Sequence, residues 1–313
     1  MPPHTLGLVG LGKIAVDQHL PSIAADPRFT LAAVVDRRGT ARPGVPSFRS
    51  QDEMLAALPD LDAVAICTPP EVRHELVRAA LAAGKHVLME KPPTATLGEL
   101  YDLVRAAAAA ERTLFATWHS QFNPAVEAAR ERLAGRRVRA VDVVWREDVR
   151  RWHPGQEWIW RTGGFGVFDP GINAFSILTR VLPFPIFVTA AALDFPAGRA
   201  TPIAARVTFR APAEAGVERF GADLDWRQEG EQTWTIAIET ADGERLELTH
   251  GGTRLTVDGA VVLAEADAEY PRIYARFAAL LAAGESDVDA EPLRLVGDAM
   301  MVGLRREVAP FDW

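Results

Sequence analysis

Short apolar runs alternate with amphipathic stretches along the first 120 residues. Five of these runs predict buried strands: Leu6–Val9, Leu31–Val35, Leu61–Ile66, His86–Met89 and Thr113–Thr117. The stretches between them carry apolar residues at helical spacing and predict helices: Lys13–Ala25, Gln51–Ala57, Glu71–Ala83 and Glu99–Ala110. Pro21 predicts a break or kink in the first helix. Alternation of this kind indicates a doubly wound parallel sheet.

The pattern changes after Phe122. A predicted helix, Pro124–Leu133, is followed by runs with strand-like alternation: Val138–Arg146, Ile186–Leu193, Ile203–Phe209, Arg219–Trp226, Thr233–Glu239, Arg245–Thr249 and Thr253–Val257. Turn signals between them predict hairpins and a mainly antiparallel sheet, and Pro271–Ala283 and Pro292–Arg306 are predicted as closing helices. We therefore predict an α/β plus α+β protein. Residues 1–120 form a Rossmann domain and residues 121–313 a substrate-binding domain with an open sheet flanked by helices.

Composition narrows the class of protein. The chain has 313 residues, of which 48% are hydrophobic and 24% charged, a balance typical of a globular protein with a full core. Its net charge of -8 argues against nucleic-acid or anionic-membrane partners. The single cysteine, Cys67, excludes an internal disulfide. The start of the chain has no signal-type segment and no apolar run is long enough to span a membrane, so we expect a cytoplasmic protein.

The first strand leads into a glycine-rich turn. Gly10-x-Gly12-x-x-Ala15 fits the dinucleotide-binding fingerprint, and Lys13 and Ile14 begin the helix whose N-terminus can bind phosphates. An ordinary strand-turn-helix is the alternative, because the motif alone is weak. The second strand, however, ends in Asp36, close to the spacing expected for a ribose-binding carboxylate. We therefore predict that the first half binds a dinucleotide.

Charges after the second strand bear on the choice of cofactor. The carboxylate of Asp36 can bond the ribose 2′-hydroxyl and repel a 2′-phosphate. Arg37 and Arg38 can neutralise the same phosphate. We predict that NAD is preferred and that NADP is accepted.

Ligands of an open parallel sheet bind beyond the carboxyl ends of its strands. The residues at these ends are Gly10–Lys13, Asp36–Arg38, Thr68–Pro70, Glu90–Pro92 and Trp118–His119. Lys91 is the first reactive candidate among them, because an amine at a strand tip can donate to a substrate hydroxyl. The alternative is a surface lysine in a turn.

Three motifs together resemble the glucose–fructose oxidoreductase / inositol dehydrogenase family. They are the Gly10-x-Gly12-x-x-Ala15 start, Thr68-Pro69-Pro70 before a helix beginning near His74, and Gly84-Lys-His-Val-Leu-Met-Glu-Lys-Pro92. The resemblance covers the first half and the plan of the second. It implies a cofactor site made of Gly10, Gly12, Lys13, Ile14, Asp36, Arg37, Arg38, Thr68, Pro69, Pro70, His74, Glu90 and Lys91, and no metal.

A second group of motifs is similar to the branch of sugar 1-dehydrogenases. It comprises Trp118-His119-Ser120, the stretch from Trp145 to Gly155, Trp158-Ile-Trp160, and Gly164-x-Gly166-Val-Phe-Asp169-Pro-Gly171-Ile-Asn173. The resemblance implies oxidation of L-arabinose, D-galactose or D-fucose at C1 to the 1,5-lactone, with NAD(P). It implies that the sugar is bound by Lys91, His119, Glu147, Trp152, His153, Asp169, Asn173 and Trp234.

One position departs from the wider family. Where that family carries its usual histidine base, this sequence has Asn173, which cannot take a proton at neutral pH. We therefore expect Lys91, Asp169 and Asn173 to be the catalytic group, with Asp169 as general base, Lys91 polarising the anomeric oxygen and Asn173 orienting the sugar. The division of the proton between Asp169 and Lys91 stays open. Asp169 and Asn173 share a face of a predicted helix, although Asp169 could instead be an N-cap and Asn173 a solvated residue.

Tryptophans gather in one short stretch. Trp145, Trp152, Trp158 and Trp160 surround His153, and we expect two of the four to be buried core. Aromatic faces can stack on the C–H groups of a sugar while Glu147, His153 or His119 bonds its hydroxyls. A purely structural role for either histidine is the alternative.

Two other functions remain open from the sequence. The chain could be an oxidoreductase of the same fold acting on a cyclitol or an imine. It could also be a non-catalytic, NAD(P)-sensing regulator, which would bind nucleotide without turnover. By fold-level analogy, the open sheet of the second half could pair two subunits as a homodimer.

Overall fold

The computed structural model describes residues 2–40 and 42–313, which form two compact units. Unit 1 consists of the described residues up to His119 and of Tyr270–Ala290, and unit 2 of Ser120–Glu269 and Glu291–Trp313. From the sequence, residues 270–290 are predicted to belong to the second domain. The structure groups them with unit 1 because the apolar face of their helix packs on the first sheet, where Phe277 stacks on Phe29 and Phe115.

Unit 1 contains a six-stranded sheet in the order β3-β2-β1-β4-β5-β6. Its strands are β1 (His4–Val9), β2 (Phe29–Val35), β3 (Ser47–Phe48), β4 (Ala63–Ile66), β5 (His86–Glu90) and β6 (Leu114–Thr117). All neighbours are parallel, which confirms the predicted doubly wound sheet. The strand order reverses between β1 and β4, the point where such sheets bind ligands.

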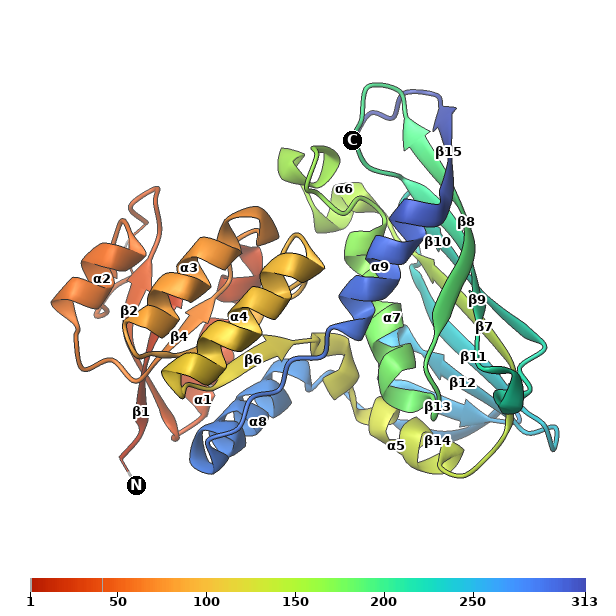
Figure 1. Ribbon diagram of the computed structural model, residues 1–313, viewed down its shortest axis with the longest axis horizontal. Coiled ribbons are helices and arrows are strands. Elements are labelled where there is room, and N and C mark those ends of the chain that lie inside the picture. The colour runs from red at the N-terminus through yellow and green to blue at the C-terminus, as the bar shows by residue number, and fades with distance from the viewer. Residues whose placement is uncertain (1, 41) are drawn as a thin grey trace. The chain divides into compact units, whose positions relative to one another are not determined.

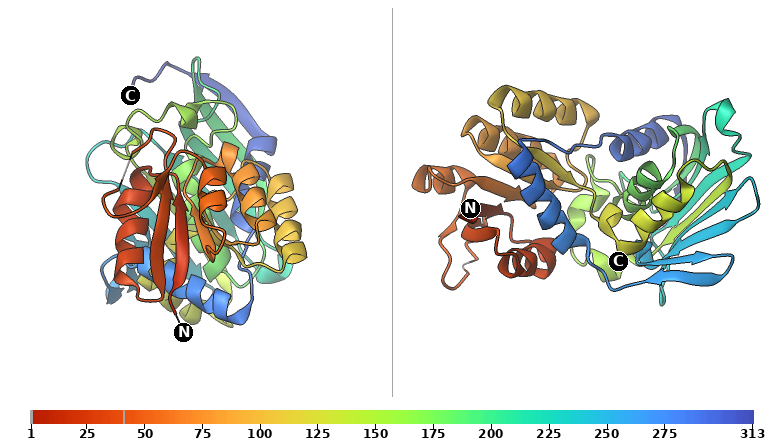
Figure 2. Two further views of the ribbon diagram at one scale, coloured as in Figure 1. Left: turned by 90° about the vertical axis from the view of Figure 1, so that its left-hand side faces the viewer. Right: turned by 90° about the horizontal axis from the view of Figure 1, so that it is seen from below.

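Helices cover both faces of this sheet. They are α1 (Leu20–Ala25), α2 (Gln51–Ala57), α3 (Pro70–Ala82), α4 (Leu97–Ala110) and α8 (Glu269–Ala283). Figure 2 shows α3 and α4 on one face and α1 and α8 on the other. Local signals set the helix starts: the Ser50 side chain caps α2, and Thr96 with Glu99 forms a capping box at α4.

The first helix contains an irregular turn. Residues Ala15–His19 form a π-helical turn, η1, that runs directly into α1. Pro21 lies at the start of α1, where its missing N–H is tolerated. The irregularity predicted at Pro21 therefore lies just before the proline, as the wide turn η1. The helix α1 continues through Pro21 itself.

Unit 2 contains a nine-stranded sheet in the order β14-β13-β12-β11-β7-β10-β9-β8-β15. The strands are β7 (Val138–Arg146), β8 (Phe187–Pro196), β9 (Ala204–Arg210), β10 (Arg219–Asp225), β11 (Thr233–Thr240), β12 (Arg245–Thr249), β13 (Arg254–Val257), β14 (Ala260–Ala264) and β15 (Gly303–Val308). Neighbours are antiparallel except β7 with β10 and β8 with β15, so the predicted mainly antiparallel sheet is confirmed.

Three helices cover one face of the second sheet (Figure 1): α5 (Pro124–Leu133), α7 (Phe168–Val181) and α9 (Glu291–Val302). Shorter helical segments lie in the connections: α6 (Val149–Trp152), η2 (His119–Phe122), η3 (Glu157–Trp160), η4 (Ala213–Ala215) and η5 (His250–Gly252). The aromatic core between helix and sheet includes Phe175, Phe209 and Phe220. In residues 2–40 and 42–313, no helix has both the length and the apolar character needed to cross a membrane.

The end of the chain differs from the prediction. The helix predicted for Pro292–Arg306 ends at Val302, and Gly303–Val308 forms β15, which pairs in parallel with β8. Gly303 disfavours helix, and the open edge of β8 offers backbone hydrogen bonds that a local pattern does not reveal. The sequence analysis did not predict strand β14, because its run Ala260–Ala264 shows no alternation of apolar and polar residues. In the structure its Val261 and Val262 are exposed.

Candidate active site

The glycine-rich turn at the end of β1 has the geometry that a dinucleotide needs. Gly10 has a φ of +96°, and an added Cβ there would lie 3.2 Å from Cys67 and Thr68. An added Cβ at Gly12 would meet nothing within 4 Å, so the backbone at Gly12 is open to approach by a phosphate. Ala15 is fully buried where the helix packs on the sheet. These residues fit a pyrophosphate at the helix N-terminus.

Asp36 is held rigidly at the end of β2. Its Oδ1 accepts a hydrogen bond from the backbone N–H of Arg38 at 3.2 Å, and its Oδ2 accepts one from the backbone N–H of Thr40 at 3.3 Å. The Thr40 hydroxyl and these N–H groups outweigh burial and lower the pKa of Asp36, so the carboxylate is ionised at neutral pH. The side chain of Arg38 is 81% exposed, with its Nε 3.8 Å from Asp36 Oδ1.

The end of β4 lies against the glycine-rich turn, as the contacts of Gly10 with Thr68 show. Pro69 occupies the N-cap position of α3, and Pro70 is the first residue of the helix. His74, one turn further along, is paired instead with α4, where its Nε2 lies 2.9 Å from Asp102 Oδ2. A cofactor role for His74 stays a prediction. Likewise Lys13 forms an ion pair with Asp17 on its own helix.

Glu90, at the end of β5, is 3% exposed and engaged by protein groups. Its Oε1 accepts a hydrogen bond from the Tyr270 hydroxyl at 2.7 Å and lies 3.0 Å from His19 Nε2. Its Oε2 accepts a hydrogen bond from the backbone N–H of Lys91 at 2.9 Å. Burial opposes ionisation, but His19, His119 and Tyr270 outweigh it and lower the pKa of Glu90 to about 2. The Glu90 carboxylate thus supports the backbone of Lys91 from within unit 1.

Sequence reasoning missed a buried arginine at the same place. Arg73 of α3 donates hydrogen bonds to the backbone carbonyls of Thr68, Glu90 and Pro92. Arg73 therefore links the end of β4 to the end of β5. Two of its acceptors, Glu90 and Pro92, are the residues before and after Lys91. The available signal was its position, since Arg73 lies one helical turn from the buried Val77 on the inward face of α3.

His119 follows β6 and lies against Tyr270, which donates to Glu90. Its ring stacks on that of Tyr270, with 6.0 Å between centroids and 22° between planes. Lys91 and His119, both predicted to bind substrate, therefore adjoin one buried cluster of Glu90 and Tyr270. Sequence reasoning did not identify Tyr270, because this residue of α8 lies 180 residues after Glu90 in the chain.

In unit 2, Asp169 is paired with a histidine. Its Oδ2 lies 3.2 Å from His153 Nε2, and Asp169 is only 4% exposed. Asp169 is within α7, whose N-cap is Val167, so the alternative of an N-cap role is wrong. Asn173 lies one turn further along α7, half-buried and on the same side of the helix. The other ring nitrogen of His153, Nδ1, is 3.4 Å from Gln156 Oε1.

Glu147 lies between two indoles. The Trp226 Nε1–H donates to its Oε1 at 3.1 Å and the Trp234 Nε1–H donates to its Oε2 at 3.0 Å. The ring of His153 lies 5.2 Å from that of Trp226, and the ring of Trp152 lies 5.5 Å from that of Trp234. The structure thus brings five of the predicted residues of unit 2 into one chain of contacts: Asp169, His153, Glu147, Trp234 and Trp152. Asn173 is related to them by its place on α7. The sequence analysis places the buried Trp226 only at the end of a predicted strand and does not predict its contact with Glu147.

The remaining tryptophans divide as expected. Trp145 and Trp160 are buried, whereas Trp152 and Trp158 are half-buried, so two of the four belong to the core. Trp160 packs edge to face on Trp226, which joins this core to the contacts around Glu147. Of the two half-buried tryptophans, Trp152 is the one that packs against Trp234, with 5.5 Å between ring centroids.

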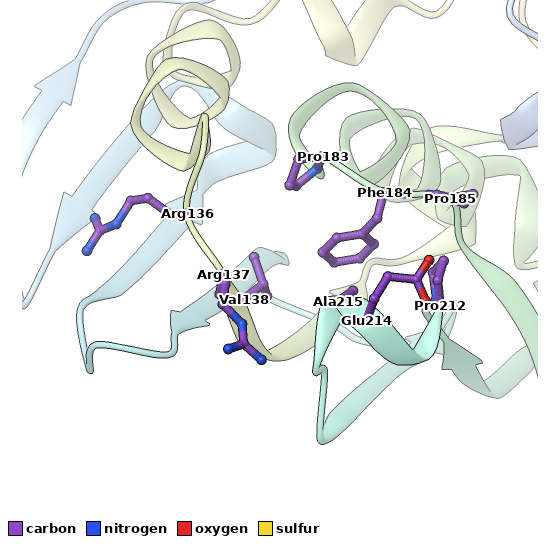
Figure 3. Close-up of a pocket in the computed structure, with 9 residues that line it drawn as sticks. All are labelled: Arg136, Arg137, Val138, Pro183, Phe184, Pro185, Pro212, Glu214 and Ala215. Carbon is purple, nitrogen blue, oxygen red and sulfur yellow. The ribbon is translucent and has the colours of Figure 1, made fainter.

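Two surface hollows lie in unit 2. One, of about 340 Å³, is lined by Phe184, its neighbouring prolines and Arg137, and it contains none of the predicted site residues (Figure 3). The other, of about 550 Å³, lies on β11–β13 and includes Trp234 and Gln232. Because Gln232 Oε1 accepts a hydrogen bond from the Trp152 indole at 3.3 Å, the second hollow adjoins the tryptophan cluster.

Comparisons with known proteins place the chain in a family. The model described as "Oxidoreductase family, NAD-binding Rossmann fold" matches residues 5–117. Galactose 1-dehydrogenase of Pseudomonas fluorescens is 46% identical over 313 residues, with 99% of each chain covered. The crystal structure of a D-galactose-1-dehydrogenase from Rhizobium etli matches with a TM-score of 0.94 and 51% identity, covering 100% of this chain and 99% of that one.

A more distant structure shares the fold alone. A 3-ketoreductase from Actinomadura kijaniata, solved with NADP, matches with a TM-score of 0.84 at 20% identity, covering 98% of this chain and 99% of that one. The family resemblance derived from the sequence motifs is thereby confirmed. This chain belongs to the oxidoreductase family with an NAD-binding Rossmann fold, and it is similar over its full length to galactose 1-dehydrogenases.

Proposed function

We propose that this protein oxidises an aldopyranose of galacto configuration at C1 to the 1,5-lactone, with D-galactose, D-fucose or L-arabinose as substrate. The observation that carries the proposal is the buried Asp169–His153 pair, which is linked through Trp226 to the carboxylate of Glu147. The likeness to galactose 1-dehydrogenases supports D-galactose among these sugars.

The cluster in unit 2 has the chemistry of a sugar site. Indole faces at Trp152 and Trp234 suit the C–H groups of a pyranose, whereas its hydroxyls need charged or strongly polar acceptors and donors. Glu147, His153 and Asn173 supply such groups. We propose that these residues bind the ring and, with Asp169, orient C1.

Oxidation at C1 removes a hydride from carbon and a proton from the anomeric hydroxyl. A nicotinamide dinucleotide held by the residues of unit 1 would supply the acceptor for this hydride. Asp169 takes the proton, and His153 at 3.2 Å holds the carboxylate in position. Lys91 donates a hydrogen bond to the anomeric oxygen, and Lys91 and His119 contact the substrate. If the Lys91 amine accepts the proton instead, Asp169 serves to orient the sugar.

Residues of unit 1 would hold the dinucleotide. Gly10, Gly12, Lys13 and Ile14 bind the pyrophosphate, and Thr68–Pro70 border it. The fixed, ionised carboxylate of Asp36 bonds the ribose hydroxyls and repels a 2′-phosphate, so NAD is preferred. The exposed Arg37 and Arg38 offset part of that repulsion, so NADP is accepted.

Replacement of Asp36 by serine is expected to reverse the cofactor preference. The ratio of kcat/KM for NAD to kcat/KM for NADP should fall about 100-fold, because a charge-assisted bond and a repulsion are both removed. Steady-state kinetics with each cofactor measures the ratio. Asp26→Ser is the matched control, since Asp26 bonds Arg28 ahead of the same strand. An unchanged ratio in Asp36→Ser would contradict the role of Asp36.

A panel of substrates tests the proposed reaction. Formation of reduced nicotinamide is followed by absorbance, with NAD or NADP in excess, for D-galactose, D-fucose, L-arabinose, D-xylose, D-glucose and myo-inositol. The three galacto-configured sugars should give the highest kcat/KM. Turnover of myo-inositol alone, or binding of NADH without turnover of any compound, would reject the proposal.

A further inference from the structure

Three segments that are distant in the sequence meet at the Glu90 carboxylate in the interior of unit 1. His19 comes from η1, directly after the glycine-rich turn, and Tyr270 comes from α8. Lys91 follows Glu90 at the end of β5. The side chains of His19, Glu90 and Tyr270 are all buried, so their hydrogen bonds are shielded from competing water.

The two carboxylate oxygens of Glu90 contact different groups. Oε2 accepts the backbone N–H of Lys91 at 2.9 Å, which fixes the peptide from which the Lys91 side chain extends. Oε1 accepts the Tyr270 hydroxyl at 2.7 Å and lies 3.0 Å from His19 Nε2. Rotation of the carboxylate would break these bonds together, so His19 and Tyr270 determine where Oε2 points.

The far side of His19 is also fixed. Its Nδ1 lies 2.8 Å from the hydroxyl oxygen of Tyr274, one turn along α8 from Tyr270. Burial alone would lower the pKa of His19, but Cys67, Tyr274 and Glu90 beside it outweigh burial and raise that pKa. His19 and Glu90 therefore form a buried ion pair, in which the loss of one partner leaves the other unpaired.

Arg73 also fixes the backbone around Lys91. Arg73 donates to the carbonyls of Glu90 and Pro92, the residues on either side of Lys91. Tyr270 in addition stacks on His119. The π-helical turn that carries His19 opens the helix next to the predicted dinucleotide site, and such turns are frequent at functional sites.

We propose that His19 and Tyr270 are positioning residues for Lys91, acting through the Glu90 carboxylate that holds the Lys91 peptide. They connect the helix that follows the glycine-rich turn to the lysine that polarises the anomeric oxygen. The proposal rests on the proposed function of Lys91. A small displacement of a reacting group is costly, about 100-fold in rate for 1 Å.

Tyr270→Phe is the first test, because it removes one hydroxyl and keeps every ring carbon. It should lower kcat for galactose oxidation about tenfold and leave the KM for NAD within about twofold. Thr240→Val is the matched control, since it also loses one buried hydroxyl, whose hydrogen bonds are to Asp242 and the backbone of Glu244 and not to the His19–Glu90–Tyr270 cluster. Both variants should lose a comparable amount of Tm, whereas the fall in kcat should be clearly larger in Tyr270→Phe.

A double variant separates positioning from general stability. In a Lys91→Met background, Tyr270→Phe should cause no further loss of kcat, because the hydroxyl acts through Lys91. The same tenfold loss in both backgrounds would overturn the proposal.

For the histidine, His19→Gln keeps an N–H donor toward Glu90 and should retain more of kcat than His19→Leu. Equal losses in these two variants would overturn the role of His19.

One readout does not depend on turnover. The sequence contains three lysines, Lys13, Lys85 and Lys91, so reductive methylation with ¹³C-formaldehyde gives few, assignable NMR signals. The Lys91 signal should shift in Tyr270→Phe, while those of Lys13 and Lys85 stay in place. An unmoved Lys91 signal would overturn the proposal. If no aldose is oxidised, the proposed function fails, and this spectrum still decides whether Tyr270 positions Lys91.

Discussion

Replacement of Lys91 by methionine should lower kcat for aldose oxidation about 1,000-fold, within the range attributed to general acid–base groups. Methionine matches the length of the lysine stem but provides no donor to the anomeric oxygen. The affinity for NADH, measured by quenching of tryptophan fluorescence, should change little, because the glycine-rich turn and Asp36 are untouched. Steady-state kinetics with D-galactose and NAD gives the loss of kcat.

Two further lysine variants sharpen this result. Lys91→Arg keeps a positive donor and should recover part of kcat if polarisation is the main role of Lys91, but little if the amine accepts the proton. Lys85→Met is a control for folding, since the buried Lys85 donates to the carbonyl of Pro59 in the same unit. It should lower Tm and preserve kcat. Wild-type kcat in Lys91→Met would exclude Lys91 from the reaction.

Asp169→Asn should lower kcat about 100- to 1,000-fold. The carboxamide keeps the shape of the side chain but cannot take a proton, and it removes the charge that faces His153 at 3.2 Å. The pH profile of kcat/KM should flatten on its acidic side in the variant. Circular dichroism and Tm establish that the buried pair has been changed without unfolding unit 2.

An exposed aspartate provides the comparison. Asp142→Asn removes a carboxylate of β7 that pairs with Arg219 on β10, away from the predicted residues, and should leave kcat unchanged. If Asp169→Asn retains wild-type kcat while Lys91→Met is inactive, the proton acceptor is Lys91. That pair of results would settle the division that the sequence left open.

The residues at the strand ends of unit 1 could be predicted because their positions follow from a local pattern. A buried strand of four or five apolar residues ends visibly at Gly10, Asp36, Thr68 or Glu90, and parallel strands bring these ends to one edge. The chemistry of Asp36 and Lys91 could be inferred from their residue types. In unit 2, Asp169, Glu147 and the tryptophans were recognised by resemblance to known sugar enzymes, not by spacing.

The partners of these residues could not be predicted, because they come from distant segments. Tyr270 reaches Glu90 across 180 residues of sequence, and Trp226 reaches Glu147 across 79. The pairing of His153 with Asp169 depends on how a loop folds back on α7. Arg73 would have been expected at the surface, since arginine is rarely buried without partners. The backbone carbonyls that bind Arg73 exist only in the folded protein.

D-galactose labelled with deuterium at C1 tests the central claim most directly. The protein is incubated with NAD and the labelled sugar, and both products are examined by mass spectrometry and NMR. Deuterium should appear in the reduced nicotinamide, and the sugar should be recovered as the unlabelled 1,5-lactone or its hydrolysed acid. Reduced nicotinamide without deuterium, or a sugar product oxidised at another carbon, would contradict oxidation at C1.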